Sequence, residues 1–176
     1  PFFLWVSLTE PHPPNVIHEP YYSMYDDLEL PRAAFQEWRS EDGEPYALYC
    51  HRLAHNPGPM SATELDKARS VYYGTVTHID HQLGRLFGKL IGDKIWDSTM
   101  VVYTTDHGEH LGDGGDFGKS DFLESAARIP LIIKPPAPFP VGTETDALVE
   151  LSDLLPTLCE VAGAPVPDDV TGRSLF

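Results

Sequence analysis

The sequence has few cysteines and few positive charges. Its 2 cysteines, Cys50 and Cys159, lie far apart and form no C-x-x-C pair, so the chain shows no disulfide framework. We interpret them as two buried thiols, with one disulfide between them as the alternative. Lys and Arg number 12 against 27 Asp and Glu, which gives a formal net charge of −15. This balance argues against nucleic acid or anionic membrane as a partner, because both bind basic surfaces.

Long hydrophobic runs are also absent. The apolar run Pro1 to Leu8 is too short for a membrane segment and has no basic leader of the kind that a signal peptide carries. The sequence starts inside this strand-like run without a methionine, so we expect it to be an excised piece of a longer protein. It contains no internal repeat and no low-complexity tract, and it indicates neither a cellular compartment nor an oligomeric state.

The composition is that of an ordinary globular domain. With 176 residues, 41% of them hydrophobic and 22% charged, the chain can build one core but not two large ones. Its 17 prolines and 14 glycines indicate long, shaped loops. The order strand, long helix, strand, strand, helix predicts an α/β fold, a layered sheet flanked by helices, in a single partial domain over residues 1–176.

Two regions carry the clearest structural patterns. Phe2 to Thr9 is a mostly continuous apolar run that predicts a strand buried on both faces, and three prolines end it. Ser61 to Ile91 predicts the longest helix, because Ser61 and Glu64 form a capping box and apolar residues recur every three or four positions. Weaker patterns predict a helix over Ala33 to Arg39, strands over Ala126 to Pro136 and Asp146 to Glu150, and a helix from Ser152 or Asp153 to Ala162 that Gly163 closes.

Two clusters of acidic and imidazole side chains receive a structural interpretation. The pair Asp26-Asp27 is interpreted as a solvated turn within the irregular stretch Asn15 to Pro59, which we expect to form one wall of a pocket. His78 and His81 share one side of the predicted long helix, and the aspartate between them points elsewhere. We therefore expect these histidines to have surface or packing roles.

The stretch Thr99 to Lys119 organises the chain. It begins as an apolar, β-branched run that predicts a buried strand, and Asp106 and His107 follow the end of that run. Open α/β sheets bind ligands and metals at the C-terminal ends of their strands. Carboxylate oxygens suit Ca²⁺ or Mg²⁺, whereas Zn²⁺ and Mn²⁺ accept imidazole more readily. Asp106 and His107 are therefore candidate metal ligands, and further ligands must come from elsewhere.

Two more residues fit an anion beside such a metal. Lys119 carries an ammonium group on a flexible stem after a glycine-rich loop, and His12 follows the predicted first strand on a stiff proline loop. His12 is a candidate second donor to the anion, or a proton donor to a leaving oxygen. The alternative is that Asp106, His107 and Gly108 open an Asx-type turn while Lys119 and His12 face solvent.

With these residues assembled, the sequence resembles the C-terminal half or so of the catalytic domain of a sulfatase, in the alkaline phosphatase-like superfamily. The matching segments cover nearly the whole chain and occur in the family's order. They are Phe2 to Pro14, with the T-x-P-H-x-P loop; Tyr72 to Gly84, with the Y-x-x-x-V-x-x-x-D-x-x-x-G helix; Asp106 to Gly112 with Gly118-Lys119, the D-[HN]-G-E-x-L-G … G-K segment; and Ser152 to Leu158 with Gly172 to Leu175, the D-L-x-P-T-L and G-x-S-L endings.

The resemblance implies metal-assisted hydrolysis of a small-molecule or glycan sulfate ester. It implies Asp106 and His107 as ligands of a divalent cation, normally Ca²⁺ with Mg²⁺ or Mn²⁺ as alternatives, and His12 and Lys119 as contacts to the sulfate. The family's nucleophile is a formylglycine made from the Cys or Ser of a C/S-x-P-x-R motif. That motif is absent from this sequence, so we expect the 176 residues alone to be inactive.

The sequence departs from the family motif at one position, and two alternative functions remain. Gly114 stands where the family commonly has histidine, so the substrate preference is not fixed by the resemblance. Phosphodiesterases and phosphonate monoester hydrolases of the same superfamily share the D-H-G-E loop, so sulfur and phosphorus esters are not separated. A non-catalytic module that binds a metal or an anion is the alternative from a different functional class.

Overall fold

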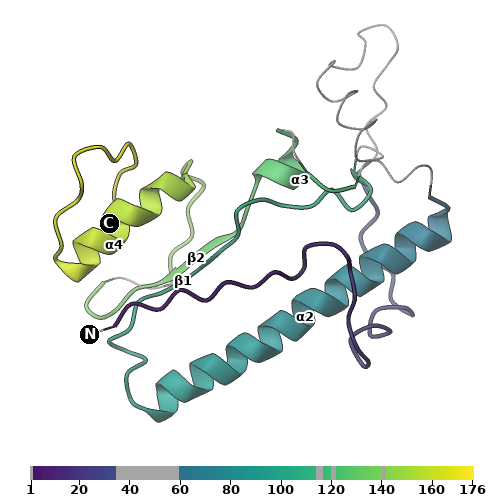
Figure 1. Cartoon of the computed structure of the whole chain (residues 1–176), viewed down its shortest axis with the longest axis horizontal. Helices are drawn as coiled ribbons and strands as arrows, with labels where there is room; N and C mark the ends of the chain where they lie inside the picture. The colour runs from purple at the N-terminus through teal and green to yellow at the C-terminus, as the bar shows by residue number, and fades with distance from the viewer. Residues whose placement is uncertain (1, 35–59, 114–116, 120–121, 140–141) are drawn as a thin grey trace, which may run out of the picture. The chain divides into compact units, whose positions relative to one another are not determined.

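The computed structural model describes residues 2–34, 60–113, 117–119, 122–139 and 142–176. The predicted helix at Ala33 to Arg39 lies mostly outside these residues, and Cys50 lies outside them entirely. Two compact units are present, Pro1–Pro136 and Ala137–Phe176. The elements, drawn in Figure 1, are α2 (Ala62–Gly92), β1 (Val101–Thr104), α3 (Glu124–Ala127), β2 (Leu131–Lys134), a 3₁₀ turn at Leu151–Asp153 and α4 (Leu154–Ala162). None of the described helices is long and apolar enough to cross a membrane.

Helix α2 confirms the predicted long helix almost to the residue. The Ser61 hydroxyl accepts a hydrogen bond from the Glu64 amide, and the Glu64 carboxylate accepts one from the Ser61 amide at 2.9 Å, which completes the capping box. The predicted apolar stripe is only partly buried, since Val76 is 40% exposed. The buried positions of the helix are Arg69, Ser70, Val71, Gly74, Thr75 and Ile79.

The two predicted strands after the helix are present as an antiparallel pair, but the one predicted over Ala126 to Pro136 spans only Leu131–Lys134, because its first two residues belong to α3. β1 pairs with β2 in a register that sets Val101 opposite Lys134 and Thr104 opposite Leu131. β1 was predicted to be buried, but its residues are half-buried or exposed, because only one neighbouring strand is present among the described residues. Pro135 follows β2 directly and cannot donate a ladder hydrogen bond, so the strand ends there.

The predicted strand Phe2 to Thr9 is not formed in the described structure. Figure 1 shows an extended segment, and it pairs with neither β1 nor β2. Its large apolar side chains are exposed by 45% to 75%, with Trp5 the most exposed. The physical reason is that a strand needs a hydrogen-bonded neighbour, and the described residues provide none for this segment. The predicted strand Asp146 to Glu150 is also wrong, because that segment is irregular.

In the unit Ala137–Phe176, helix α4 and the C-terminal tail are held together. The Asp153 carboxylate accepts hydrogen bonds from the Glu150 amide at 3.0 Å and the Arg173 amide at 2.9 Å. The Thr157 hydroxyl is fully buried and accepts one from the Leu175 amide at 3.0 Å. The predicted closure at Gly163 is confirmed, with φ at +64°. Cys159 is a free thiol and is only half-buried.

Candidate active site

Asp106 and His107 lie directly after β1, where the sequence predicted metal ligands. The His107 amide donates to Asp106 Oδ1 at 3.1 Å, and His107 Nε2 lies 3.6 Å from the same oxygen. His107 Nδ1 donates to the Gly108 carbonyl at 2.8 Å, which leaves Nε2 as the nitrogen with a free lone pair. Metal-binding histidines commonly have their second nitrogen fixed in this way. The side chains therefore present one carboxylate and one oriented imidazole.

The Asp106 carboxyl group is set up to be ionised. Desolvation acts to raise its pKa, but hydrogen bonds from the backbone amides of Asp106 and His107 and from the Thr105 hydroxyl, together with the electrostatic interaction with His107, act in the opposite direction. The net effect lowers the pKa of Asp106 below its usual value of 3.8. The side chain is 80% exposed, so an incoming cation has open access to a charged oxygen ligand.

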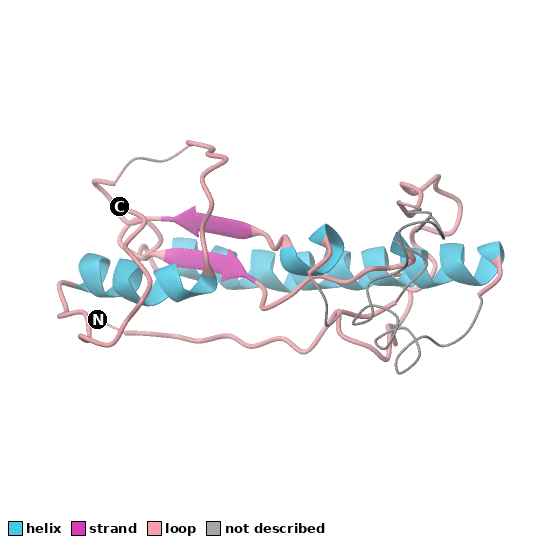
Figure 2. Cartoon of the chain, turned by 90° about the horizontal axis from the view of Figure 1, so that it is seen from above, coloured by secondary structure: helices cyan, strands magenta, loops and turns pink. Residues whose placement is uncertain are grey.

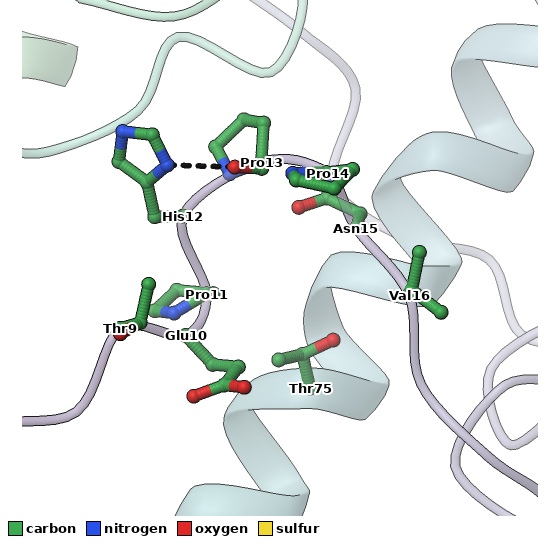
Figure 3. Close-up of a pocket in the computed structure, with 9 residues that line it drawn as sticks. All are labelled: Thr9, Glu10, Pro11, His12, Pro13, Pro14, Asn15, Val16 and Thr75. Atoms are coloured by element: carbon green, nitrogen blue, oxygen red, sulfur yellow. Dashed lines mark hydrogen bonds between the residues drawn. The ribbon is translucent and has the colours of Figure 1, made fainter.

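The structure brings His12 to the same place. Its ring centroid lies 6.3 Å from that of His107, with the two rings edge to face. Figure 3 shows His12 Nδ1 hydrogen-bonded to the Pro13 carbonyl at 2.7 Å, so Nε2 is again the available nitrogen. Residues nearly a hundred positions apart, each predicted to act at one site, are therefore neighbours.

A cavity of about 250 Å³ lies between the His12 loop and Thr75 of α2, and His12 is one of its lining residues. Glu10 points toward the helix in this cavity, as Figure 3 shows. Asp106, His107 and Lys119 do not line it. We therefore place the candidate site on the open side of Asp106 and His107 and not in this cavity.

Gly108 and His110 attach the loop to the residues around α3. The Gly108 amide donates to the Ala126 carbonyl at 2.8 Å, and a Cβ at Gly108 would lie 2.0 Å from the Ser125 carbonyl oxygen. Only glycine fits this close approach. His110 is 1% exposed, and its Nδ1 lies 2.7 Å from the Ser125 hydroxyl oxygen. These contacts are structural, so His110 is buried in the protein and does not face the ligand pair.

Two further side chains hold the loop. The Arg69 guanidinium on α2 donates to the Leu111 carbonyl at 2.7 Å and also to the Pro31 carbonyl. The Asp113 carboxylate accepts from the Ala34 amide at 2.8 Å. The loop after β1 is therefore held by α2, by the residues around α3 and by the segment before residue 35. Among the described residues of the loop, Asp106 presents an exposed carboxylate and His107 an oriented imidazole.

Glu109 and Lys119 are connected through one glycine. The Glu109 carboxylate accepts a hydrogen bond from the Gly118 amide, and the His110 amide donates to the Gly118 carbonyl at 3.0 Å. Lys119, the next residue, is half-buried. Its ammonium group forms no hydrogen bond or ion pair with any residue that the structure describes. The sequence reading assigned no role to Glu109, and its position nine residues before Gly118 gave no signal of this contact.

His78, His81 and Asp26, which we expected to have structural roles, contact neighbouring parts of the chain. Tyr21 donates to or accepts from His81 Nδ1 at 2.9 Å, and its ring lies 4.9 Å from that of His78. Asp26 forms an ion pair with Lys67 at 2.7 Å and accepts a hydrogen bond from the Ser70 hydroxyl at 2.6 Å. The turn was predicted to be solvated, but Asp26 attaches it to α2.

The donor set fits a divalent cation in part. Within the described ranges, no group of three or more His, Cys, Asp or Glu side chains is arranged around one point. Asp106 and His107 supply two ligand types that such cations accept, and a complete shell needs donors beyond them.

Comparisons with known proteins agree on one family. The family model described as Sulfatase matches residues 1–164. An arylsulfatase from Clostridium perfringens is 34% identical over 99% of this chain. The phosphonate monoester hydrolase SpPMH from Silicibacter pomeroyi superposes with a TM-score of 0.77 at 33% identity, over 94% of this chain and 34% of its own.

A third solved structure comes with a ligand. It is a protein in complex with its substrate D-glucosamine-2-N,6-O-disulfate, and it matches with a TM-score of 0.62 at 31% identity, over 74% of this chain and 27% of its own. The chain spans 37% of the length of the clostridial relative, so these similarities concern about a third of each longer protein. The alkaline phosphatase-like α/β fold predicted from the sequence agrees with these neighbours.

Proposed function

The chain belongs to the sulfatase family, and from that premise we propose that it contributes part of an active site that hydrolyses sulfate esters with a divalent cation. The observation that carries the proposal is the meeting of His12 with the Asp106–His107 pair at the end of β1. These are the residues that match the family's metal-binding and sulfate-binding motifs. A single partial catalytic domain over residues 1–176 is part of the same proposal.

Asp106 and His107 would hold the cation. The carboxylate of Asp106 supplies a charged oxygen, and the hydrogen bond from His107 Nδ1 to Gly108 aims its Nε2 away from the backbone. When bound, the cation neutralises charge on the oxygens of the ester and of the nucleophile. We propose Ca²⁺ as the natural ion, with Mg²⁺ or Mn²⁺ as alternatives, because the family binds Ca²⁺ and the set includes a hard carboxylate oxygen.

Lys119 and His12 would act on the substrate. The ammonium group of Lys119 donates hydrogen bonds to sulfate oxygens and balances their charge, which the net charge of −15 makes necessary. His12 Nδ1 is occupied by the Pro13 carbonyl, so a proton held at Nε2 is the one it can give to the leaving oxygen. Both residues therefore bind the ester, and His12 also assists the departure of the alcohol.

The nucleophile is expected outside these 176 residues. Neither Cys50 nor Cys159 lies in a C/S-x-P-x-R context, and the chain spans about a third of its clostridial relative. We propose that a formylglycine in the rest of the protein attacks the ester. The 176-residue chain assayed alone is expected to show no turnover of an aryl sulfate, and measurable turnover would disprove that part of the proposal.

The decisive experiment is a paired assay on the full-length protein. Hydrolysis of 4-nitrophenyl sulfate that requires added Ca²⁺ and is lost in Asp106→Asn supports a sulfatase. A glucosamine sulfate is the natural second substrate to try, since one neighbour binds such a disulfate. Binding of Ca²⁺ and sulfate without any turnover would instead identify a non-catalytic binding module.

A phosphonate monoester or phosphodiester hydrolase is the second candidate. The structural likeness to the phosphonate monoester hydrolase from Silicibacter pomeroyi favours it. The same preparation should therefore be assayed on a phenyl phosphonate monoester and on bis-4-nitrophenyl phosphate. A kcat/KM higher on either phosphorus ester than on the sulfate would replace the sulfatase proposal with this one.

A further inference from the structure

We propose that Glu109 is a positioning residue that sets Lys119 at the candidate site by holding the backbone of Gly118. This inference rests on the proposed function, because it takes Lys119 to be the residue that contacts the ester anion. The contact on which it depends is independent of that function, since the Glu109 carboxylate accepts the Gly118 amide hydrogen bond in the structure itself.

The geometry favours a role in positioning over one in ligand binding. Glu109 directs its carboxylate back to Gly118, whereas Asp106, three residues earlier, keeps its carboxylate 80% exposed. Asp106 also accepts a backbone amide hydrogen bond, so exposure is what separates the two carboxylates: Glu109 is half-buried, whereas a cation can reach Asp106. Asp106 and Glu109 therefore have different tasks, one for the cation and one for the segment that carries the lysine.

The Gly118 peptide is held from both sides. Its amide donates to Glu109, and its carbonyl accepts from the amide of His110 at 3.0 Å. Both partners belong to the segment that follows His107. The two hydrogen bonds therefore fix the backbone just before Lys119 relative to the two metal-ligand candidates. A charge-assisted hydrogen bond is about twice as strong as a neutral one, so Glu109 makes the stronger of these two contacts.

Tyr72 on α2 lies close enough to Glu109 to be affected by its charge. Burial, and next the charge of Glu109, raise the pKa of Tyr72 on α2 to about 12, so this neighbour stays neutral at ordinary pH. Lys119 itself has no ion-pair partner among the described residues, so its ammonium group is not drawn to Glu109 or to another carboxylate there. The structure thus separates the backbone anchor of Lys119 from its charged end, which stays available to an anion.

The test uses the full-length protein with five variants: Glu109→Ala, Glu109→Gln, Lys119→Met, the double variant Glu109→Ala/Lys119→Met, and Glu124→Ala as a control. Glu124 is an exposed glutamate in the first turn of α3, outside the proposed machinery. Aryl sulfate kinetics, or kinetics on the phosphorus ester that the protein prefers, are measured for each. Hydrogen exchange followed by mass spectrometry is measured on the peptide that contains Phe117, Gly118 and Lys119.

Glu109→Ala is expected to raise KM about tenfold and to leave kcat within about threefold, because one charge-assisted hydrogen bond is lost and the bound lysine shifts. Glu109→Gln keeps an acceptor oxygen and should recover most of the loss. In the Lys119→Met background, Glu109→Ala should add almost nothing, because residues that act as one unit are non-additive. Glu124→Ala should behave as the parent protein.

Additive losses in the double variant would overturn the inference, and so would a Glu109→Gln variant as impaired as Glu109→Ala. Hydrogen exchange separates this failure from a failure of the proposed function. Faster exchange of the Gly118 peptide in Glu109→Ala, but not in Glu109→Gln, supports the anchor even if neither ester is turned over. Unchanged exchange in Glu109→Ala overturns the anchor even in an active sulfatase.

Discussion

Some residues of the loop after β1 attach it to the rest of the chain, and others offer ligand atoms to solvent. Gly108, His110 and Asp113 use their polar or backbone groups on neighbouring parts of the chain. Asp106 and His107 keep ligand atoms on the open side. In the part of this loop that the structure describes, this division leaves Asp106 and His107 as the metal-ligand candidates. Residue type alone makes His110 look equal to His107, and burial separates them.

The first prediction separates the metal ligand from the anion contact. Asp106→Asn in the full-length protein should weaken Ca²⁺ binding by about tenfold or more, because a charged oxygen ligand is replaced by a neutral one. Lys119→Met should leave Ca²⁺ affinity nearly unchanged and weaken competitive inhibition by inorganic sulfate. Isothermal titration with Ca²⁺, together with inhibition constants for sulfate, measures both. Equal losses of Ca²⁺ affinity in the two variants would contradict this assignment.

The places of the candidate residues were predictable from the sequence where the signal was local, and their roles stay predictions. Asp106 and His107 directly follow an apolar run, and His12 follows another, so their type and place pointed to one chemistry. The anchoring of Gly118 by Glu109 was not predictable, because the two residues are nine positions apart and nothing in the local pattern pairs them. Gly108 was visible only as a turn former, since its close approach to Ser125 is a tertiary contact.

At the scale of the element, α2 is the part on which the described loops of its unit assemble. Tyr21, Asp26 and Leu111 each contact it, through His81, Lys67 and Arg69 respectively. Figure 2 shows its length alongside the β1–β2 pair. Its capping box made it predictable because both cap residues lie within four positions of sequence. Its buried side was less predictable, because several of the buried residues are small or polar and pack against loops. A periodic pattern of apolar residues does not reveal such contacts.

The second prediction compares two glycines of α2. A Cβ at Gly74 would lie 2.0 Å from the Tyr21 carbonyl oxygen, whereas nothing lies within 4 Å of one at Gly84. Gly74→Ala should therefore destabilise the chain by about 1–3 kcal/mol through overpacking against backbone. Gly84→Ala should stabilise it by up to about 1 kcal/mol, because alanine is the better helix former. Thermal unfolding measures both, and a shift of the same sign in the two variants would refute the packing.

The third prediction concerns pH and the contacts between α4 and the tail. Hydrogen bonds from the Arg173 amide and then the Glu150 amide lower the pKa of Asp153 below its usual value of 3.8. The stabilisation is therefore present above the unfolded-state pKa and is lost as pH falls through the folded-state value. Hydrogen exchange of the α4 peptide should accelerate in the wild type relative to Asp153→Asn as pH falls from about 5 to about 3.

Exposed Asp168 provides the matched control for this pH experiment. Asp168→Asn should keep the acid-dependent loosening of α4 that the wild type shows. If Asp153→Asn loosened in acid as much as the wild type does, the Asp153 carboxylate would not be the group responsible. Comparison at each pH between variants removes the intrinsic pH dependence of exchange.

At the scale of the whole molecule, the family and the α/β class were predictable because four motifs recur in the same order along the chain. The strand Phe2 to Thr9 shows the limit of such reasoning. Its apolar pattern is that of a buried strand, but burial depends on neighbours that a sequence pattern does not supply. In the described structure its side chains are exposed, and it has no ladder partner.

The last prediction follows from that exposed segment. Phe3 and Trp5 alternate onto one side of the extended segment and are 72% and 75% exposed, so they form a contiguous apolar surface. The 176-residue chain produced alone should therefore self-associate through Phe2 to Leu8, since an apolar segment with free backbone groups is a template for pairing. Phe3→Ser/Trp5→Ser should reduce the association measured by size-exclusion chromatography with light scattering. Phe122→Ser, at a phenylalanine outside the segment that is 97% exposed, should have little effect, and an equal effect there would rule out the segment as the contact.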